Sequence, residues 1–373
     1  ALLPRTVSAA PWTVPSVAAM LTGVYPHRLG LAQWEQPWPA KHPSLFDLAA
    51  DRGFEVASFV FEPHYFLRGV PAARVAGSSQ NTGGVIDWLR DRKAGRFFAF
   101  VHYWWTHVPY IDRPTTVPEW RKLTDVVLDA VRAGGAAREG VKGLYRRAVE
   151  RFSEEWLPRV LDAVDLEHTW VVLIADHGES WGERPGRPEV RDVFDLHGND
   201  LFEETLRVPW LVRPPGGCTP RTVGGLARTV DVFPTLAELV GLGAVPADID
   251  GRSLADGVLD GRPAPSEDAV SVRNRDVLNR PQLPDDPRDL WCGWALTTSR
   301  DKVVWEPGKS SRQRYDLAAD PCEIHNLYRG NDPAAAELWK RLQAEAARAV
   351  VGPAGGEDLA RTAARLRGLG YLE

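Results

Sequence analysis

The sequence is poor in cysteine, in lysine and in long apolar runs, and each shortage excludes a class of protein. Its 373 residues include only Cys218, Cys292 and Cys322, an odd and widely spaced set that argues against a disulfide framework or a zinc knuckle, while one bridge stays open. The longest apolar run, residues 97–105, is far shorter than the roughly 18 residues that span a bilayer. Lysine supplies 7 of the 45 basic residues and the net charge is −5, so we expect no nucleic-acid partner.

Methionine is equally scarce, since Met20 is the only one and the chain starts at Ala1. The first residues carry neither the basic stretch nor the apolar core of a signal peptide. We therefore expect that a leading segment was removed or that the sequence is a fragment. The compartment stays open between cytoplasmic, exported and membrane-anchored.

The remaining composition, 44% hydrophobic and 25% charged, is that of an ordinary globular protein. Residues 144–164 carry apolar side chains at four-residue steps, which predicts a helix, and residues 169–175 follow as a buried strand. Further strands are predicted at 54–61, 97–104 and 207–213, and further helices at 45–50 and 231–242. This alternation of helices and strands predicts an α/β fold.

The chain is predicted to hold two units. We expect a large α/β domain over residues 1–270 and a small α+β subdomain over residues 271–373. In the second unit, residues 294–298 and 302–305 alternate like the strands of a small antiparallel hairpin, and residues 334–350 predict a terminal helix.

Candidate functional residues follow the predicted strands. Asp176 and His177 come directly after the strand at 169–175, and His107 follows the strand at 97–104. Ligands of α/β proteins collect at the carboxyl ends of strands, and a carboxylate beside an imidazole is a common pair of metal ligands. His197, in a short polar stretch further on, is a weaker candidate of the same kind. Together these residues indicate a metal-assisted hydrolase, although a helix cap and surface histidines would give the same pattern.

Thr13 is a candidate nucleophile. It stands with Ser16 at the start of an apolar, helix-like run, where a hydroxyl is helped by the free N–H groups and the dipole of the helix. The same pattern describes an ordinary threonine or serine cap, which is the commoner use of such a residue.

Several short motifs follow one another along the chain. They are residues 13–17 (TVPSV), 21–26 (LTGVYP), 107–110 (HVPY), 176–179 (DHGE), 197–209 (HGNDLFEETLRVP), 231–236 (DVFPTL), 250–254 (DGRSL) and 315–321 (YDLAADP). In this order, and over nearly the whole chain, they resemble the sulfatase family of the alkaline phosphatase superfamily. The resemblance implies an alkaline-phosphatase-like three-layer sandwich, with a central, mostly parallel sheet and the small C-terminal subdomain.

The resemblance also implies a metal-dependent hydrolase of sulfate or phosphate esters. Asp176 and His177 would bind a divalent cation, either Ca, Zn or Mn. Thr13 would be the nucleophile, and His107 and His197 would act on the anion or its leaving group as donors or as a general acid. The substrate would be a small-molecule, glycan or lipid ester. Trp104, Trp105 and Trp181 would line a sugar-stacking wall or belong to the core.

Two departures from the family pattern modify this expectation. Sulfatases oxidise a cysteine or serine to formylglycine, whereas Thr13 stands at that position here and Val17 replaces the arginine of the motif. Threonine is the nucleophile of phosphodiesterase and phosphotransferase relatives, so Thr13 attacking phosphorus directly is the alternative. The family also opens with a strand that ends in a metal-binding aspartate. Only twelve residues precede Thr13 and none is acidic, so we expect both this first strand and its aspartate to be absent. This chain is therefore expected to have little activity as it stands, and a catalytically inactive binding module of the same fold is a further alternative.

Overall fold

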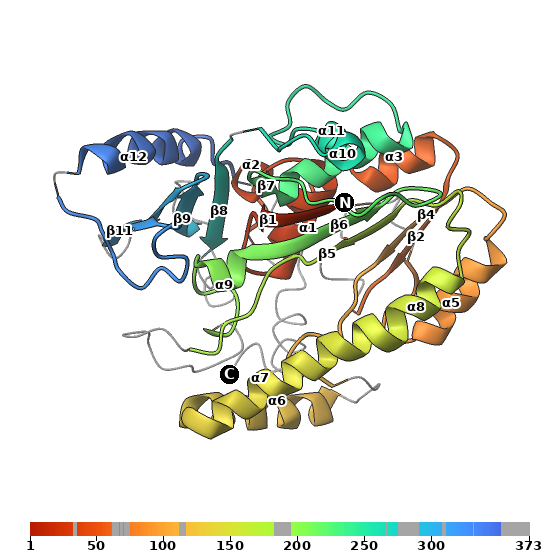
Figure 1. Cartoon of the computed structure of the whole chain (residues 1–373), viewed down its shortest axis with the longest axis horizontal. Helices are drawn as coiled ribbons and strands as arrows, with labels where there is room; N and C mark the ends of the chain where they lie inside the picture. Colours follow the sequence, from red (N-terminus) through yellow and green to blue (C-terminus); the bar gives the residue numbers. More distant parts are fainter. Residues whose placement is uncertain are drawn as a thin grey trace.

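The structure, a computed structural model, describes the chain except for residues 33–35, 62–66, 68–69, 71–74, 112–116, 183–194, 266, 275–290, 308–310, 331 and 352–373. Within the described part, helices and strands alternate as the sequence predicts (Figure 1). No helix of that part is both long and apolar enough to cross a membrane. All three cysteines are free thiols.

The first sheet has four strands in the order β5-β6-β1-β7. These are β1 (Leu2–Val7), β5 (Val171–Ile174), β6 (Arg207–Arg213) and β7 (Ala227–Arg228). A strand of the sheet, β1, therefore does precede Thr13, in contrast to the expectation that the first strand is absent, and Ser8 rather than an aspartate follows it. Strand β6 runs antiparallel to both β1 and β5, while β1 is parallel to β7. The carboxyl ends of β1 and β5 therefore lie at the same edge of this sheet.

The second sheet has three parallel strands in the order β3-β2-β4. They are β2 (Glu55–Phe59), β3 (Val75–Gly77) and β4 (Phe97–Val101). The side chains of β4 pack alternately against two hydrophobic clusters, so both of its faces are covered. Every residue of β4 and of β5 is nevertheless partly exposed, so the prediction of a buried strand at 169–175 is wrong in its burial. The described strands of the α/β unit thus form two sheets rather than one continuous sheet.

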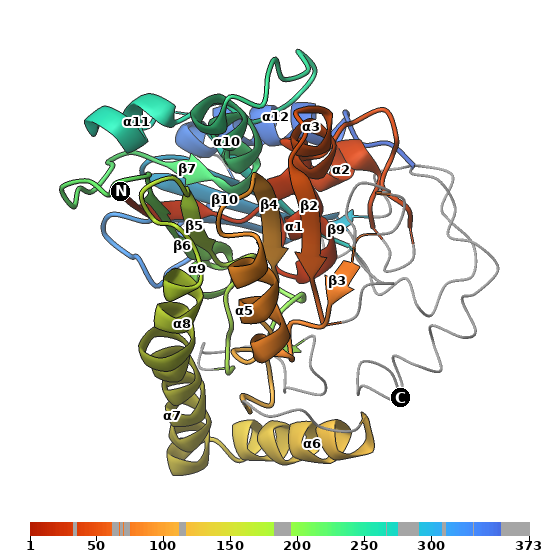
Figure 2. The same ribbon diagram turned by 90° about the vertical axis from the view of Figure 1, so that its right-hand side faces the viewer.

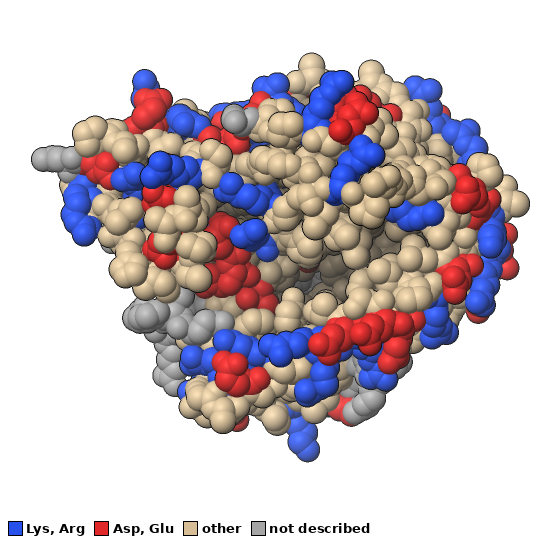
Figure 3. Space-filling model, viewed as in Figure 1, with Lys and Arg blue, Asp and Glu red and all other residues tan. Residues whose placement is uncertain are grey.

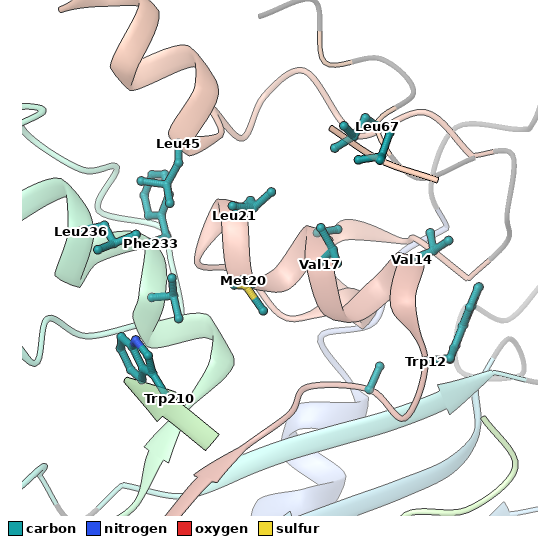
Figure 4. Packing of buried hydrophobic residues seen from close by; sticks show 14 of the residues in the cluster. Trp12, Val14, Val17, Met20, Leu21, Leu45, Leu67, Trp210, Phe233 and Leu236 are labelled. Atoms are coloured by element: carbon teal, nitrogen blue, oxygen red, sulfur yellow. The ribbon is translucent and has the colours of Figure 1, made fainter. Parts of the chain in front are cut away.

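Helix α1 (Thr13–Thr22) lies in the core, and every one of its residues is buried. Figure 4 shows its apolar side chains among those of neighbouring elements. The core cluster around it includes Val14, Val17, Met20, Leu21, Leu45, Trp210, Phe233 and Leu236. Helix α1 ends at Gly23, whose φ of 73° is one that side-chain-bearing residues rarely adopt. This burial fixes the position of the N-terminus of α1.

Other helices surround the sheets. They are α2 (Pro26–Leu29), α3 (Leu45–Asp51), α5 (Thr82–Asp91), α6 (Val117–Ala133), α9 (Glu203–Leu206), α10 (Val232–Val240) and α11 (Ala255–Asp260). The helix predicted at 144–164 is confirmed and is longer than expected. It starts as α7 (Gly135–Arg151), passes through a π-helical turn at Phe152–Trp156 and ends as α8 (Leu157–Asp162). Figure 2 shows α7 and α8 in one line beneath the strands.

The third sheet is antiparallel, in the order β11-β10-β9-β8. Its strands are β8 (Ala269–Asn274), β9 (Trp291–Thr297), β10 (Asp301–Glu306) and β11 (Ser311–Asp316), and α12 (Pro333–Ala346) packs against it. The hairpin predicted at 294–305 is confirmed as β9 and β10. The domain boundary at 270 stays a prediction, because β8 crosses it and also binds the first unit: Val272 N–H donates to Ala9 O, and Ser271 Oγ to Ser8 O.

Candidate active site

The five residues singled out from the sequence lie together. Thr13 is the first residue of α1, Asp176 and His177 follow β5, and His107 and His197 lie in loops. Thr13 Oγ1 is 3.4 Å from His177 Nε2. The His197 ring lies 4.7 Å from the His177 ring and 4.9 Å from the His107 ring, between centroids. The carboxyl ends of β1, β4 and β5 and the N-terminus of α1 build this cluster.

Thr13 does not cap its helix. The N-cap of α1 is Trp12, which makes no side-chain capping bond, so the capping interpretation of Thr13 is wrong. Thr13 is one residue further into the helix, where its hydroxyl turns toward His177 instead. The indole of Trp12 donates to Asn274 Oδ1 at 2.8 Å, which ties the start of α1 to the end of β8.

The loop after β5 is held from both sides. The hydroxyls of Ser8 and Ser16 lie 2.6 and 2.5 Å from the backbone oxygen of Asp176. On the other side, Gly178 N–H donates to Thr205 O at 2.8 Å. A Cβ atom on Gly178 would lie 2.1 Å from the backbone oxygen of Glu204, closer than any real contact. Glycine is therefore the residue that lets the loop rest against α9.

Hydrogen bonding fixes the tautomer of His177. Its Nδ1 lies 2.8 Å from the backbone oxygen of Gly178, and a carbonyl only accepts, so Nδ1 carries the proton. Burial lowers the pKa of His177, an effect that outweighs the opposing influence of Asp176, so the ring is neutral at pH 7. The Nε2 lone pair is consequently available on the side where Thr13 lies.

Asp176 is held as a carboxylate. Burial alone would raise its pKa, but the positive charge that His177 carries when it is protonated, together with polar contacts from His102 and the Thr13 hydroxyl, holds the pKa well below its usual range. One oxygen, Oδ1, accepts the backbone N–H of His177 at 3.0 Å. The other, Oδ2, is buried and accepts no hydrogen bond of ordinary length in the described part of the chain. A buried anionic oxygen in this state is costly unless a cation meets it.

Asp176 and His177 fit a divalent cation. Asp176 Oδ2 and His177 Nε2 are 3.6 Å apart. The nitrogen is unprotonated and the oxygen is anionic, so the two atoms repel one another unless a positive charge lies between them. Oxygen and imidazole nitrogen together suit Zn, Mn or Ca in different coordination spheres. Among the described residues, no set of three or more His, Cys, Asp or Glu side chains has a metal-binding arrangement, so this pair supplies only two ligands.

His107 is buried as a neutral ring. Its Nδ1 lies 2.7 Å from the backbone oxygen of Val108 and therefore carries the proton. Burial lowers the pKa of His107 well below its ordinary value, and His197 lowers it further. Trp104 stacks on the ring with centroids 4.0 Å apart. Nε2 of His107 thus carries a lone pair, and it can donate only after it takes up a proton.

His197 belongs to a hydrogen-bonded chain. Its Nδ1 lies 2.8 Å from Glu179 Oε1, and the hydroxyl of Tyr110 donates to Glu179 Oε2 at 3.0 Å. Trp181 Nε1 in turn donates to the Tyr110 oxygen at 3.0 Å. Trp181 is therefore part of this network.

Sequence reasoning missed three contributors to the site: His102, Ser8 and Glu179. Nε2 of His102 lies 3.6 Å from Asp176 Oδ2. His102 directly follows β4, but the strand predicted at 97–104 contained it, so the strand-end rule that selected Asp176 passed over it. Ser8 directly follows β1, a strand that the sequence did not predict. Glu179 carried no such signal, because only the fold brings it to His197.

The aromatic residues near the site have structural roles. Trp104 and Trp105 are 7% and 2% exposed, so they belong to the core rather than to an open wall.

Figure 3 shows the surface hollowed near the position of β5 in Figure 1, with mostly uncharged residues around the hollow. Basic and acidic side chains alternate elsewhere on this face, which gives it no single sign of charge.

Comparisons with known proteins agree with the fold and the motifs. The sequence model of the sulfatase family, described as "Sulfatase", matches residues 1–62 and 79–242, more than half of the chain. The endo-4-O-sulfatase of Bacteroides thetaiotaomicron is 27% identical over 53% of this chain and 37% of that protein. The ulvan-active sulfatase of Formosa agariphila is 27% identical over 62% of this chain and 43% of that protein. The chain thus spans less than half the length of these two curated relatives.

Solved structures with the same fold cover more of the chain. The phosphonate monoester hydrolase of Agrobacterium radiobacter superposes with a TM-score of 0.68 at 18% identity, over 92% of this chain and 88% of that one. A structure solved in complex with its substrate, D-glucosamine-2-N,6-O-disulfate, superposes with a TM-score of 0.62 at 14% identity, over 93% and 89%. These likenesses establish an alkaline-phosphatase-like α/β fold.

Proposed function

Because the chain belongs to the sulfatase family, we propose that it is a metal-dependent hydrolase of sulfate or phosphate esters in which Thr13 is the nucleophile. Enzymes of this family are generally metal-dependent. The observation that carries the proposal is the 3.4 Å approach of Thr13 Oγ1 to the unprotonated Nε2 of His177, next to the unsatisfied Oδ2 of Asp176. In an ordinary helix cap, the threonine hydroxyl would accept a hydrogen bond from a backbone N–H of the first turn of its own helix.

Asp176 and His177 are proposed to hold the cation, through Oδ2 and Nε2. When bound, a divalent cation screens the charge of the ester oxygens and lowers the pKa of a neighbouring hydroxyl. Thr13 stands at the N-terminus of a fully buried ten-residue helix, where backbone N–H groups and the helix dipole favour an anionic group. This position supports binding of a sulfate or phosphate group against Thr13.

We propose the following reaction at these residues. The Thr13 hydroxyl loses its proton to water as its oxygen forms a bond to sulfur or phosphorus and the bond to the leaving oxygen breaks. A second water then hydrolyses the ester on Thr13, and the Thr13 oxygen takes up a proton again. His197 is proposed to take up a proton on Nε2 and to give it to the leaving oxygen. His107, whose ring packs against that of His197, is proposed to contact the bound anion. Because burial lowers the pKa of His107, its Nε2 donates to the anion only when the negative charge of the anion stabilises the protonated ring.

The test replaces the nucleophile. Thr13→Ala is expected to lower kcat by at least about 10³-fold in a protein supplied with divalent metal, as loss of a nucleophile does in hydrolases. Aryl sulfate, phosphate monoester and phosphodiester substrates are each assayed with Ca, Mn and Zn. Thr22→Ala, at a buried threonine at the other end of the same helix whose hydroxyl bonds only to the backbone of Ala18 and Val24, is the matched control and should keep its kcat. Equal activity of Thr13→Ala and the unaltered protein would remove Thr13 from the mechanism.

Direct attack on phosphorus is the second candidate, either in a phosphodiesterase or in a phosphotransferase. The observation in its favour is that residue 13 is threonine, which does not give formylglycine by the oxidation used for cysteine or serine. A phosphothreonine at position 13, trapped during turnover and located by mass spectrometry, supports it. A sulfated threonine favours the sulfatase reaction instead. If calorimetry detects no divalent cation binding, the inactive binding module replaces both.

The substrate is proposed to be a small-molecule or glycan ester. Structural neighbours support this class, since one was solved with a disulfated glucosamine and another with neocarrahexaose. A lipid ester remains a competing candidate from the sequence. Hydrolysis rates of sulfated sugars and of phospholipids, compared in the same preparation, decide between them.

A further inference from the structure

We infer that Glu179 is a positioning residue for His197: it holds the ring with Nδ1 protonated and leaves Nε2 for the substrate. His197 Nδ1 lies 2.8 Å from Glu179 Oε1. The side chains are 4% and 6% exposed, so water competes little for this bond. A carboxylate accepts hydrogen bonds and donates none, and it therefore selects the tautomer with the proton on Nδ1. The catalytic use of Nε2 rests on the proposed function, but the tautomer does not.

The second oxygen of Glu179 is also in use. Tyr110 has one hydroxyl proton, and its oxygen already accepts the indole N–H of Trp181 at 3.0 Å. The Tyr110 proton consequently goes to Glu179 Oε2, also at 3.0 Å. Since both oxygens accept hydrogen bonds inside this network, Glu179 acts on the reaction through His197 rather than on the substrate itself.

Tyr110 is held at its place by the fold. Its φ of 63° lies in the left-handed region, which residues other than glycine rarely adopt and which persists only where the surroundings determine it. The ring is 5% exposed and packs edge-on against Tyr145, with centroids 5.5 Å apart. A buried, backbone-strained tyrosine therefore orients the carboxylate that orients His197. Rigid support of this kind keeps a catalytic ring in its productive geometry.

The experiment reads the tautomer directly. Protein labelled with ¹⁵N at histidine is studied without metal or substrate by long-range ¹H–¹⁵N spectroscopy, and His197→Ala identifies the His197 signals. We expect Nδ1 of His197 to be the protonated nitrogen. Glu179→Gln should keep this pattern, because the amide oxygen still accepts from Nδ1–H. Glu179→Leu should lose it, with Nε2 becoming protonated in part of the molecules.

Kinetics give the second readout. Glu179→Leu should lower kcat about 10- to 100-fold with little change in KM, as loss of an orienting partner does, and Glu179→Gln should recover most of it. Tyr145→Phe is the control, since it alters a tyrosine that packs on the same network but forms no described bond to Glu179. A wild-type His197 protonated on Nε2, or an unchanged tautomer in Glu179→Leu, overturns the inference. Because the spectra need no turnover, this failure is distinct from failure of the proposed hydrolase, which the Thr13 variants report.

Discussion

Replacing Gly178 with alanine tests whether the loop after β5 depends on its contact with α9. The added Cβ would lie 2.1 Å from the backbone oxygen of Glu204 and 3.2 Å from Cα of Thr205. Real Cβ contacts are not shorter than 3.0 Å, so the two backbones have to separate by roughly 0.9 Å. The φ of Gly178 is not in the left-handed region, so this close approach, rather than backbone conformation, is what requires glycine.

The separation has two consequences of predictable size. Forcing an atom into a packed contact typically costs about 1–3 kcal/mol of the free energy of unfolding. The hydrogen bond from Gly178 N–H to Thr205 O, 2.8 Å long, is strained by the same movement. Asp176 and His177 precede Gly178 directly, so they move with it. A displacement of about 1 Å at a reacting centre lowers kcat by about 10²-fold.

Two measurements check these figures: the free energy of unfolding in urea, followed by tryptophan fluorescence, and kcat on the best ester substrate. Gly140→Ala is the matched control, because Gly140 lies in α7 with no atom within 4 Å of the position of its Cβ. That change should stabilise the protein by about 0.5–1 kcal/mol through helix propensity, with kcat unaltered. The reasoning is refuted if the free energy of unfolding of Gly178→Ala lies within about 0.5 kcal/mol of that of the unaltered protein and its kcat is also unchanged.

Two further predictions concern stability. Lys302 is fully buried, with Nζ 3.2 Å from Glu203 and 2.9 Å from Glu323. Lys302→Met should therefore lower the free energy of unfolding in urea by about 3–5 kcal/mol, because it leaves buried carboxylates unpaired, and adding Glu323→Leu should restore part of that loss. An unchanged urea midpoint for Lys302→Met would contradict this. Burial lowers the pKa of His27, although hydrogen bonding to Glu345 opposes the shift. Because the folded protein binds that proton less readily than the unfolded chain, stability from His27 is present above its ordinary pKa and is lost as the pH falls below about 6.5, with a slope of up to about 1.4 kcal/mol per pH unit. In His27→Gln the unfolding free energy should fall less steeply between pH 6.5 and 5, and an identical slope would argue against this origin.

Local patterns predicted most of the secondary structure. Strand β6 has the predicted bounds of 207–213, and the hairpin of β9 and β10 follows the predicted alternation. The strand predicted at 97–104 ends at Val101, although the apolar run continues to Trp104, a buried residue whose ring stacks on that of His107. An apolar run in the sequence indicates which residues are buried, and buried residues can extend beyond the last residue that pairs in a sheet.

The site was predictable where residues follow strands and not where partners come from distant segments. Asp176, His177 and His107 were selected by their positions in the chain. The role of Glu179 depends on a bond to a residue 18 positions later and on Tyr110, 69 positions earlier. The failure of the capping interpretation of Thr13 has the same cause, since its competing partner, His177, lies 164 positions away. Pairings of this length leave no periodic signal in the sequence.

The hydrogen bonds around α1 also determine when, during synthesis of the chain, the start of this helix can reach its native contacts. The segment from Ser8 to Thr13 is completed by Asp176, at a separation of 168 residues from Ser8, and by Asn274, at a separation of 262 residues from Trp12. At about 5–20 residues per second, synthesis of the stretch up to Asn274 takes roughly 13–50 s. During that interval the segment from Ser8 to Thr13 is already made but lacks these partners, so the start of α1 reaches its native contacts only after most of this part of the chain has been synthesised.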